Sequence, residues 1–565
     1  MDALLSKLPP PVATAAATAS SSVLAARADL RDALIRVNPA AAAVPAVAID
    51  VVVLWALLRL VRLLGDVARA LSGRRRPPLA TVSRLPLVGG LVDFLGGPRA
   101  LLGKLHPRYG DVFTVPLAHK RMTFLIGPAA SAPFFKASDE DMSQDEVYAF
   151  NIPVFGKGVV YDVPLAERRE QFRMLGEALK TARLEEYVPK MVAEAEDFFR
   201  QGPWGRVTEA AERRRRASGG GGALGTGNKT SDGEVVSLKD ELAELIIRTA
   251  SLTLLGKEVR ESMFEEVKDL YNDLDAGMQP ISVLLPYLPT RAHAKRDAAR
   301  IKMKDVFTKV IAARREAQAK GAKPQIDMLQ TIMDGSYRDG TKLTEDQITG
   351  MLIAGLFAGQ HTSSVTSSWL GLFVADDRDR LLPALLEEQK RIIRQHGDNL
   401  SLSILSDMPV LHRYMQETLR INPPLVLLMR YARKAFETTT TKGERFTVPK
   451  GDIVAVSPTF SGTLDSVWKD PARFDPDRWA PPRLEADVRP YSFLGFGGGR
   501  HRCMGENFAF LQVKLIWSLL LRRFNVELVD PFPQPDYEAM VIGPKKCAVR
   551  ITARVPVLCA ATVGK

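Results

Sequence analysis

A single cysteine near the C-terminal end of the chain lies in a loop that could hold a metal-bound cofactor. Residues 496–505 read Phe-Gly-Gly-Gly-Arg-His-Arg-Cys-Met-Gly, and the apolar segment 508–521, a predicted helix, follows almost directly. A cysteine binds metal as the thiolate, and the charges of Arg500 and Arg502 together with a helix N-terminus favour that form. The glycines allow the backbone to approach a flat group closely. We therefore expect Cys503 to be a thiolate metal ligand.

A second group of unusual residues interrupts an apolar helix expected over residues 345–372. Residues 354–364 read Ala-Gly-Leu-Phe-Ala-Gly-Gln-His-Thr-Ser-Ser, and glycine and hydroxyl side chains are poor choices for a helix interior. The hydroxyls can bond back to the preceding turn and distort the helix, which opens a groove for a small ligand. Histidine titrates near neutral pH, so His361 could relay protons; the alternative is a histidine satisfied in the core.

The cysteine loop, residues 496–505, resembles the haem-binding loop of the cytochrome P450 family, because Phe496, Gly499, Cys503 and Gly505 match the pattern FxxGxRxCxG, although His501 stands at the position of the pattern's arginine. The resemblance implies a mainly α P450 fold with a small β-rich region, and haem b with the Cys503 thiolate as the axial iron ligand. It also implies that Phe496, Arg500 and Gly505 belong to the cofactor-binding loop. A structural cysteine in a glycine-rich turn would explain none of these other positions.

Residues 354–364 resemble the central helix of the same family, whose groove holds dioxygen over the iron. Most members carry an acid before the threonine, whereas this chain has His361 before Thr362. That form is found in the sterol 14α-demethylase branch. The resemblance implies that His361 and Thr362 are catalytic and deliver protons.

Glu417 and Arg420 are spaced to lie on one face of a predicted helix. Alone, this pair also fits an ordinary solvated helix. Residues 474–479, Phe-Asp-Pro-Asp-Arg-Trp, resemble the second half of a P450 pairing, which implies a buried charge network of Glu417, Arg420 and Arg478. We expect a structural role, because removing one partner of a buried ion pair is strongly destabilising.

Residues 147–162 resemble the substrate-recognition segment of sterol 14α-demethylases, and the neighbouring sequence is similar to that of plant-type members. Their aromatic side chains would form flat apolar walls for a rigid lipid; the alternative is a buried loop with aromatic anchors. The residues implied to contact substrate are Phe150, Phe155, Phe357 and Ala358. The residues implied to contact the haem propionates are Tyr148, Arg430 and His501.

The resemblance implies a monooxygenase of sterol biosynthesis that removes a sterol 14α-methyl group by three oxidations and releases formate. Each oxidation would use one dioxygen and two electrons, passed from NADPH by NADPH-cytochrome P450 reductase. Phe150 stands where phenylalanine is associated with obtusifoliol and a smaller residue with lanosterol, so we expect obtusifoliol to be preferred. The alternatives are another P450 monooxygenase of a lipophilic substrate and a haem-thiolate protein without monooxygenase activity.

The composition agrees with these expectations. The chain has 565 residues, a formal net charge of +12 and three cysteines, and so few cysteines argue against an oxidising compartment. The positive charge fits nucleic acid, an anionic membrane or an acidic protein, but no nucleic-acid motif occurs and we expect no nucleic-acid partner. The basic surface expected to dock an acidic reductase consists of Arg500, Arg502, Lys514 and Arg522.

Three predicted parts precede the catalytic domain. Residues 1–40 form a low-complexity leader, residues 41–64 an apolar run of about the length of a bilayer span, and residues 65–80 a basic, proline-containing hinge. The arginines at 74–76 favour a membrane anchor with the catalytic domain in the cytosol. We expect the endoplasmic reticulum membrane; the alternative is an organelle membrane reached through a transit peptide.

The elements that must position these groups follow from the pattern of apolar residues. The catalytic domain is expected over 81–565, with a flexible glycine-rich insertion at 213–234. Alternation predicts two early strands, 112–116 and 121–126. Apolar residues three and four apart predict helices over 191–199, 238–255, 302–319 and 382–395.

Overall fold

The computed structural model describes residues 75–80, 93–94, 97–117, 120–217, 233–283, 286–537 and 539–554. The chain divides into two compact units, Met1–Arg75 and Arg76–Lys565, and the description concerns the second. The expected leader, the expected anchor at 41–64 and most of the expected hinge lie outside the described residues. Within those residues, no helix is both long enough and apolar enough to cross a membrane.

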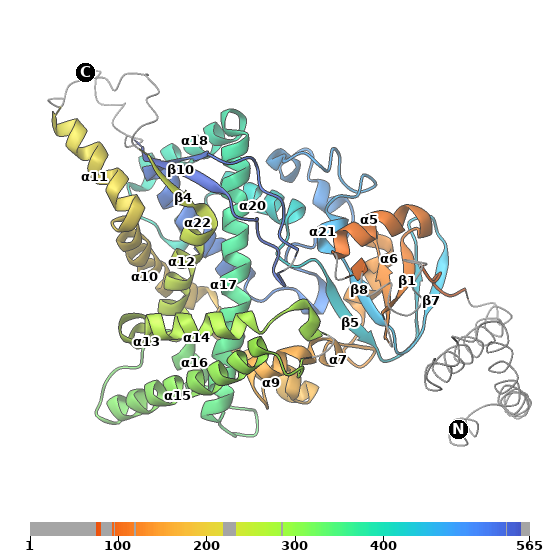
Figure 1. Cartoon of the computed structure of the whole chain (residues 1–565). Helices are drawn as coiled ribbons and strands as arrows, with labels where there is room; N and C mark the ends of the chain where they lie inside the picture. The colour runs from red at the N-terminus through yellow and green to blue at the C-terminus, as the bar shows by residue number, and fades with distance from the viewer. Residues whose placement is uncertain are drawn as a thin grey trace, which may run out of the picture. The chain divides into compact units, whose positions relative to one another are not determined.

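Helices dominate the described part of the chain, as Figure 1 shows. The α-helices are α5 (Pro98–Tyr109), α6 (Gly127–Lys136), α7 (Asp145–Tyr148), α8 (Ile152–Phe155), α9 (Leu165–Glu177), α10 (Thr181–Phe199), α11 (Gly202–Ala217), α12 (Leu238–Ala250), α13 (Lys257–Ser262), α14 (Phe264–Ala276), α15 (Arg291–Ala319), α16 (Met328–Asp334), α17 (Glu345–Asp376), α18 (Arg378–His396), α19 (Leu402–Ser406), α20 (Pro409–Ile421), α21 (Pro458–Ser461) and α22 (Glu506–Arg523). Shorter helical segments include η2 (Ala149–Asn151), η5 (Ser251–Leu255), η7 (Pro476–Trp479) and η9 (Gly499–His501).

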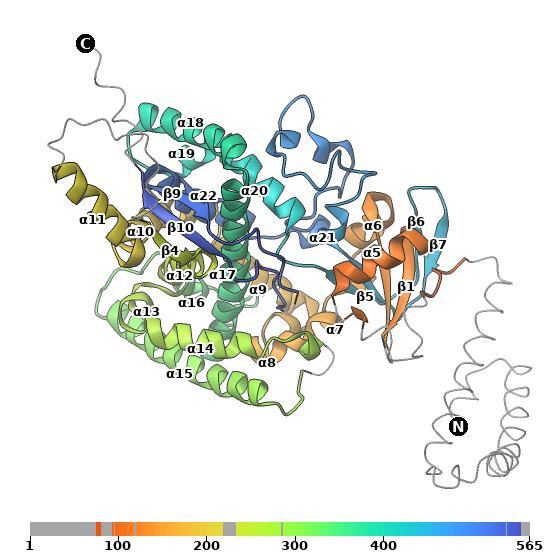
Figure 2. The same cartoon turned by 45° about the horizontal axis from the view of Figure 1, so that its top comes forward.

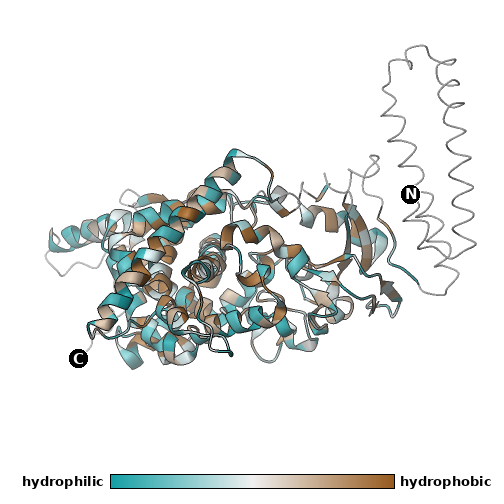
Figure 3. Ribbon diagram, turned by 90° about the horizontal axis from the view of Figure 1, so that it is seen from below, coloured by the Kyte–Doolittle hydropathy of each residue, from teal (hydrophilic) through white to brown (hydrophobic). Residues whose placement is uncertain are grey.

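Helix α17 runs through the middle of the helical region and packs against α12, α15, α20 and α22 (Figure 2). Its start is fixed by a capping box: the Thr344 hydroxyl accepts from the Gln347 N–H, and the Gln347 side chain accepts from the Thr344 N–H. Farther along, Trp369 and Leu370 are completely buried. In Figure 3, which views the molecule at right angles to Figure 1, other elements surround this helix. A helix that is packed on most sides holds its functional side chains in fixed positions.

The strands form three sheets within the described residues, ordered β1-β2-β8-β5-β3, β4-β10-β9 and β6-β7. They are β1 (Val112–Leu117), β2 (Lys120–Leu125), β3 (Met142–Ser143), β4 (Glu234–Ser237), β5 (Leu428–Ala432), β6 (Phe436–Thr439), β7 (Arg445–Val448), β8 (Ile453–Val456), β9 (Phe524–Leu528) and β10 (Ala548–Ala553). In the five-stranded sheet, β2 and β8 pair in parallel and the other neighbours are antiparallel. This sheet lies beside α5 and α6 in Figure 1, away from most helices.

The two early strands and the helices expected from the sequence are confirmed as β1, β2, α10, α15, α17, α18 and α22. The helix expected over 238–255 differs at its end, because α12 stops at Ala250 and continues as the π-helical segment η5. There the Thr249 and Thr253 hydroxyls donate to backbone carbonyls in the preceding turn. Such back-bonding competes with regular helix geometry.

The expected insertion at 213–234 is wrong at both ends. Residues 213–217 continue α11, and Glu234 already belongs to β4; residues 218–232 lie outside the described residues. Residues 213–216 are all arginine, which is a good helix former. Nη2 of Arg213 lies 3.9 Å from Oε2 of Glu209, one turn earlier. The basic residues therefore extend a helix rather than begin a loop.

Candidate active site

The loop before α22 fixes the backbone of Cys503. The Cys503 N–H donates to the Phe496 carbonyl at 2.9 Å, which closes the loop. Gly499 has φ +61°, and a Cβ there would lie 2.1 Å from the Phe135 carbonyl oxygen. Only glycine fits so close an approach in this backbone conformation. Cys503 is an exposed residue, so the loop does not close it off from a ligand.

Arg502 favours the Cys503 thiolate, as expected, but desolvation opposes its effect. Desolvation raises the pKa of Cys503, although the Gly505 N–H and Arg502 act in the opposite direction. The guanidinium of Arg502 is already bound by Glu506, with Nε–Oε2 at 2.7 Å and Nη2–Oε1 at 2.8 Å. A metal ion on the sulfur would itself keep the thiolate deprotonated.

A buried arginine and a half-buried histidine lie around Asp139, after the end of α6. Arg430 donates through Nη1 to the Phe134 carbonyl at 2.7 Å and through Nη2 to the Ser138 carbonyl at 3.0 Å. Its Nε is buried and has no partner among the described residues. Nε2 of His501 lies 2.8 Å from an oxygen of Asp139, but it is aligned too poorly for a hydrogen bond. The Arg430 Nε and the His501 Nε2 therefore both lack a hydrogen-bond partner among the described residues, although Asp139 stays close to the second.

Tyr148 belongs to the 147–162 segment and contacts β5 from the end of α7. Its hydroxyl accepts from the Met429 N–H at 3.2 Å, and a phenol can also donate one hydrogen bond. Burial raises the pKa of Tyr148. A cysteine open to a metal, the Arg430 Nε without a hydrogen-bond partner and the neutral phenol of Tyr148 fit haem, whose iron needs an axial donor and whose propionates need hydrogen-bond donors.

Helix α17 places His361 and Thr362 side by side. The Thr362 hydroxyl donates to the Ala358 carbonyl at 2.6 Å, so the expected back-bonding is present, and α17 nevertheless continues without a break. Nε2 of His361 lies 3.1 Å from Oδ1 of Asp275 on α14, although not in hydrogen-bond alignment. The Tyr271 ring packs 5.3 Å from the imidazole. Sequence reasoning missed Asp275, because no motif links α14 to α17.

The residues expected to contact substrate meet at one aromatic cluster. The Phe155 and Phe357 rings are in edge contact, with centroids 6.3 Å apart, and Phe150 lies 6.1 Å from the Tyr148 ring. Phe150 and Phe155 are buried, whereas Ala358 is exposed one turn before Thr362. The segment after α7 and the middle of α17 thus supply two apolar walls.

The structure brings Glu417, Arg420 and Arg478 together. Glu417 is fully buried, and its Oε1 lies 2.8 Å from Nη2 of Arg420 and 3.0 Å from Nε of Arg478. Its carboxylate also accepts from the Trp479 indole at 3.0 Å and from the Asp475 N–H at 2.8 Å. With every oxygen engaged, this carboxylate ties α20 to η7.

The expected basic surface is wrong for two of its four residues. Lys514 and Arg522 are buried, at 5% and 7% exposure. Lys514 donates to the Leu405 carbonyl at 3.0 Å, and burial lowers the pKa of Lys514 to about 8. Arg522 donates to Gln389 and to the Asp398 carbonyl. Both lie on the face of α22 that packs inward, which the sequence pattern did not reveal.

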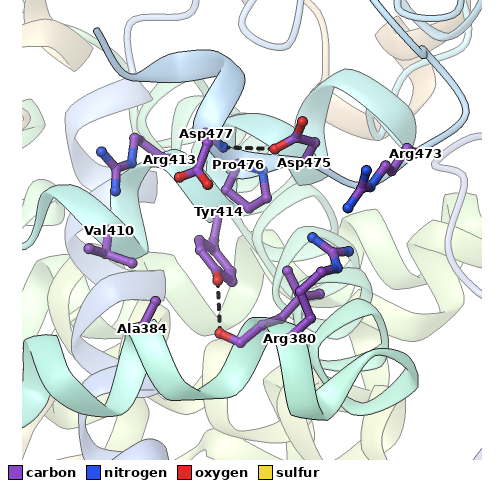
Figure 4. Close-up of a pocket in the computed structure, with 10 residues that line it drawn as sticks. Arg380, Ala384, Val410, Arg413, Tyr414, Arg473, Asp475, Pro476 and Asp477 are labelled. Carbon is purple, nitrogen blue, oxygen red and sulfur yellow. Dashed lines mark hydrogen bonds between the residues drawn. The ribbon is translucent and has the colours of Figure 1, made fainter.

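A hollow of about 180 Å³ lies between α18, α20 and residues 473–477 (Figure 4). In Figure 4 the guanidinium groups of Arg380 and Arg473 point toward each other, and Arg413 lies on the opposite side of the hollow. Arg413 and Arg473 form no ion pair with any residue that the structure describes. Next to Arg413, the His412 ring stacks on Phe510 at 4.1 Å, and Phe510 contacts Phe496 of the cysteine loop. Helix α20, which lines the hollow through Arg413, thus also contacts α22 beside the cysteine loop, through His412.

A helical fold with one cysteine loop before its last long helix and a buried Glu–Arg network fits a haem-thiolate protein. The chain belongs to the cytochrome P450 family, whose sequence pattern matches residues 77–550. The fold is similar to that of retinoic acid-bound cyanobacterial CYP120A1, with a TM-score of 0.68 at 21% identity over 85% of this chain and 100% of that chain.

Sterol demethylases from plants and from an animal are similar to this chain in sequence. The chain is 46% identical to the sterol 14-demethylase of Arabidopsis thaliana over 84% of this chain and 91% of that protein. It is 47% identical to the obtusifoliol 14-alpha demethylase of Triticum aestivum over 83% of this chain and 96% of that protein. The lanosterol 14-alpha demethylase of Homo sapiens is 38% identical over 75% of this chain and 76% of that protein.

Proposed function

We propose that the protein is a sterol 14α-demethylase, a cytochrome P450 monooxygenase of sterol biosynthesis. The observation that carries the proposal is its identity of 46–47% to plant sterol demethylases over more than nine-tenths of their length. The aromatic cluster beside α17 supports it, because a rigid apolar substrate needs rigid apolar walls. The reaction removes the 14α-methyl group through three oxidations and releases it as formate.

We assign haem b to the site at Cys503. When bound, haem activates dioxygen so that one oxygen atom enters a carbon–hydrogen bond. The Cys503 sulfur would hold the iron, in a loop framed by Phe496, Arg500 and Gly505. The groups that would hold the propionates are the Arg430 Nε, the His501 ring and the Tyr148 hydroxyl.

Each oxidation consumes one dioxygen, two electrons and two protons, and yields water beside the oxidised sterol carbon. The Asp275 carboxylate is 43% exposed and 3.1 Å from the His361 imidazole, so it can pass protons from solvent to Nε2. The Thr362 hydroxyl donates to the Ala358 carbonyl, which leaves its oxygen lone pairs open to a further donor. We propose that Asp275 and His361 carry protons from solvent and that Thr362 acts in the same delivery.

We propose obtusifoliol as the preferred substrate, oriented by Phe150, Phe155, Phe357 and Ala358. Phe150 is 6% exposed and rests against Tyr148, so its ring has little room to turn away. A large side chain in that wall disfavours sterols with a second methyl group at C4, by a factor typical of a single methyl group in an apolar pocket.

The electrons come from a reductase, and we propose NADPH-cytochrome P450 reductase as the donor. The unpaired guanidinium groups of Arg413 and Arg473 at the hollow support docking of an acidic protein beside the cysteine loop. We further propose attachment to the endoplasmic reticulum membrane through residues 41–64, with the catalytic domain in the cytosol.

The test is an optical titration of the full-length protein. The reduced protein should give the Soret band of a thiolate-ligated carbon monoxide complex, and obtusifoliol should shift the oxidised protein from low to high spin more strongly than lanosterol. Turnover with reductase and NADPH should release formate. A thiolate band without a response to either sterol would point to another P450 monooxygenase, and no NADPH-dependent turnover would point to a non-monooxygenase haem protein.

A further inference from the structure

A buried arginine holds the backbone of the aromatic cluster in place. Arg300 on α15 is 8% exposed, and both its Nε and its Nη2 donate to the Phe155 carbonyl, at 3.3 and 3.1 Å. The same Nη2 lies 3.0 Å from Oδ1 of Asp346 in the first turn of α17. One guanidinium thus joins α15, α17 and the last residue of α8. Only a planar fork can serve acceptors in these two directions.

Two glycines make room for this contact. Gly156 has φ +98°, and a Cβ there would lie 2.4 Å from Nη2 of Arg300. On the other side of the Phe155 carbonyl, a Cβ on Gly350 of α17 would lie 2.1 Å from its oxygen. The carbonyl is therefore confined between a guanidinium and a helix backbone that have no space to spare.

Desolvation disfavours the charged form of the buried Arg300 and lowers its pKa. Asp346 offsets the cost of burying this charge only in part, because its carboxylate is 37% exposed. A leucine at position 300 would pack α15 as well without this cost. The fixed position of Phe155, whose ring meets Phe357 at 6.3 Å, is what the buried charge provides.

We infer that Arg300 is a positioning residue for substrate: through the Phe155 carbonyl it sets where the Phe155 ring stands against Phe357, and hence how tightly the sterol is held. This inference rests on the proposed function. Arg300 acts through Phe155 and does not itself touch the substrate. A misplacement of the wall by a fraction of an ångström weakens sterol binding without disturbing the cysteine loop.

The test compares Arg300→Lys with Arg314→Lys in haem-loaded, full-length protein. Arg314 is a matched control, because it lies on the same helix, is 4% exposed and also bridges separate elements, through Glu258 and Asp327. We expect Arg300→Lys to raise the obtusifoliol dissociation constant, read from the spin-state shift, by about tenfold, with the carbon monoxide band unchanged. Arg314→Lys should lower the unfolding temperature and leave that constant within about twofold.

A second pair of variants decides the question if the lysine variants do not fold. Gly350→Ala pushes against the Phe155 carbonyl, whereas Gly371→Ala on the same helix pushes against Trp517, at 2.5 Å. Only Gly350→Ala should weaken obtusifoliol binding. Unchanged binding in both Arg300→Lys and Gly350→Ala, or equal weakening in the controls, would overturn the inference. Wild-type protein that responds to no sterol would instead refute the proposed substrate class.

Discussion

The imidazole of His361 on α17 lies 3.1 Å from the carboxylate of Asp275 on α14. If this pair carries protons, Asp275→Asn and His361→Ala should each slow formate release by about tenfold or more. They should also raise the hydrogen peroxide formed per NADPH, because electrons then arrive without matched protons. Asp273→Asn, two residues away on α14, is the control. Normal coupling in Asp275→Asn would remove that carboxylate from the path.

The Glu417 carboxylate should be essential for stability rather than chemistry. Glu417→Gln leaves the buried guanidinium groups of Arg420 and Arg478 without their shared charge, which costs about 3–5 kcal/mol. We expect denaturant unfolding at lower concentration and a smaller fraction of protein with the thiolate carbon monoxide band. Glu316→Gln removes an exposed pair with Lys320 and should cost less than about 0.5 kcal/mol. Equal stability of the two variants would contradict a structural role for Glu417.

The buried Lys514 should make stability depend on pH. Its folded-state pKa of about 8 is below the ordinary value of 10.5, so the unfolded chain binds more protons between these values and stability rises with pH across that range. Lys514→Met removes the cost of burying the charge and should stabilise the protein at pH 7. The gain should shrink by about 1.4 kcal/mol on going to pH 9.

Denaturant unfolding of Lys514→Met at pH 7 and pH 9 measures this change. Lys320→Met is the control, because Lys320 is 73% exposed and should show no such trend. A gain that stays constant between the two pH values would mean that Lys514 is neutral or solvated throughout.

Charge reversal at the hollow should impair reduction. We expect Arg413→Glu and Arg473→Glu to lower the rate of reductase-dependent reduction by about tenfold at low salt, with less difference at high salt. Sterol binding should not change. Arg338→Glu replaces an arginine that is 85% exposed on another part of the protein and should reduce normally. If all three variants reduce alike, the docking surface lies elsewhere.

Those parts of the fold that depend on residues close together in the chain could be predicted from the sequence. Helix α17, the strands β1 and β2, and the cysteine loop each follow from residues close together in sequence. The charge network of Glu417 was predictable only through the family resemblance of two separate motifs. Burial was the weak point: Lys514 and Arg522 lie on a helix that is apolar on most sides, and their partners, Leu405 and Gln389, come from other helices.

Contacts between distant elements could not be predicted from the sequence. Asp275 and Arg300 carry no motif, and each matters only because α14 and α15 pack against α17 or α8. The pKa of Cys503 shows the same limit. The charges beside it are visible in the sequence, but Glu506 already binds Arg502, and desolvation outweighs the remaining attraction.

Helix α6 serves both halves of the candidate haem site. Its Phe134 carbonyl binds Arg430, which lies 296 positions later in the chain, and the Phe135 carbonyl confines Gly499 before Cys503. Contacts of such long range form late, because the intervening chain must first be ordered. During synthesis the ribosome must release nearly the whole polypeptide before the cysteine loop can rest on α6. Chains that end before Cys503 should therefore be unable to bind the cofactor at this site.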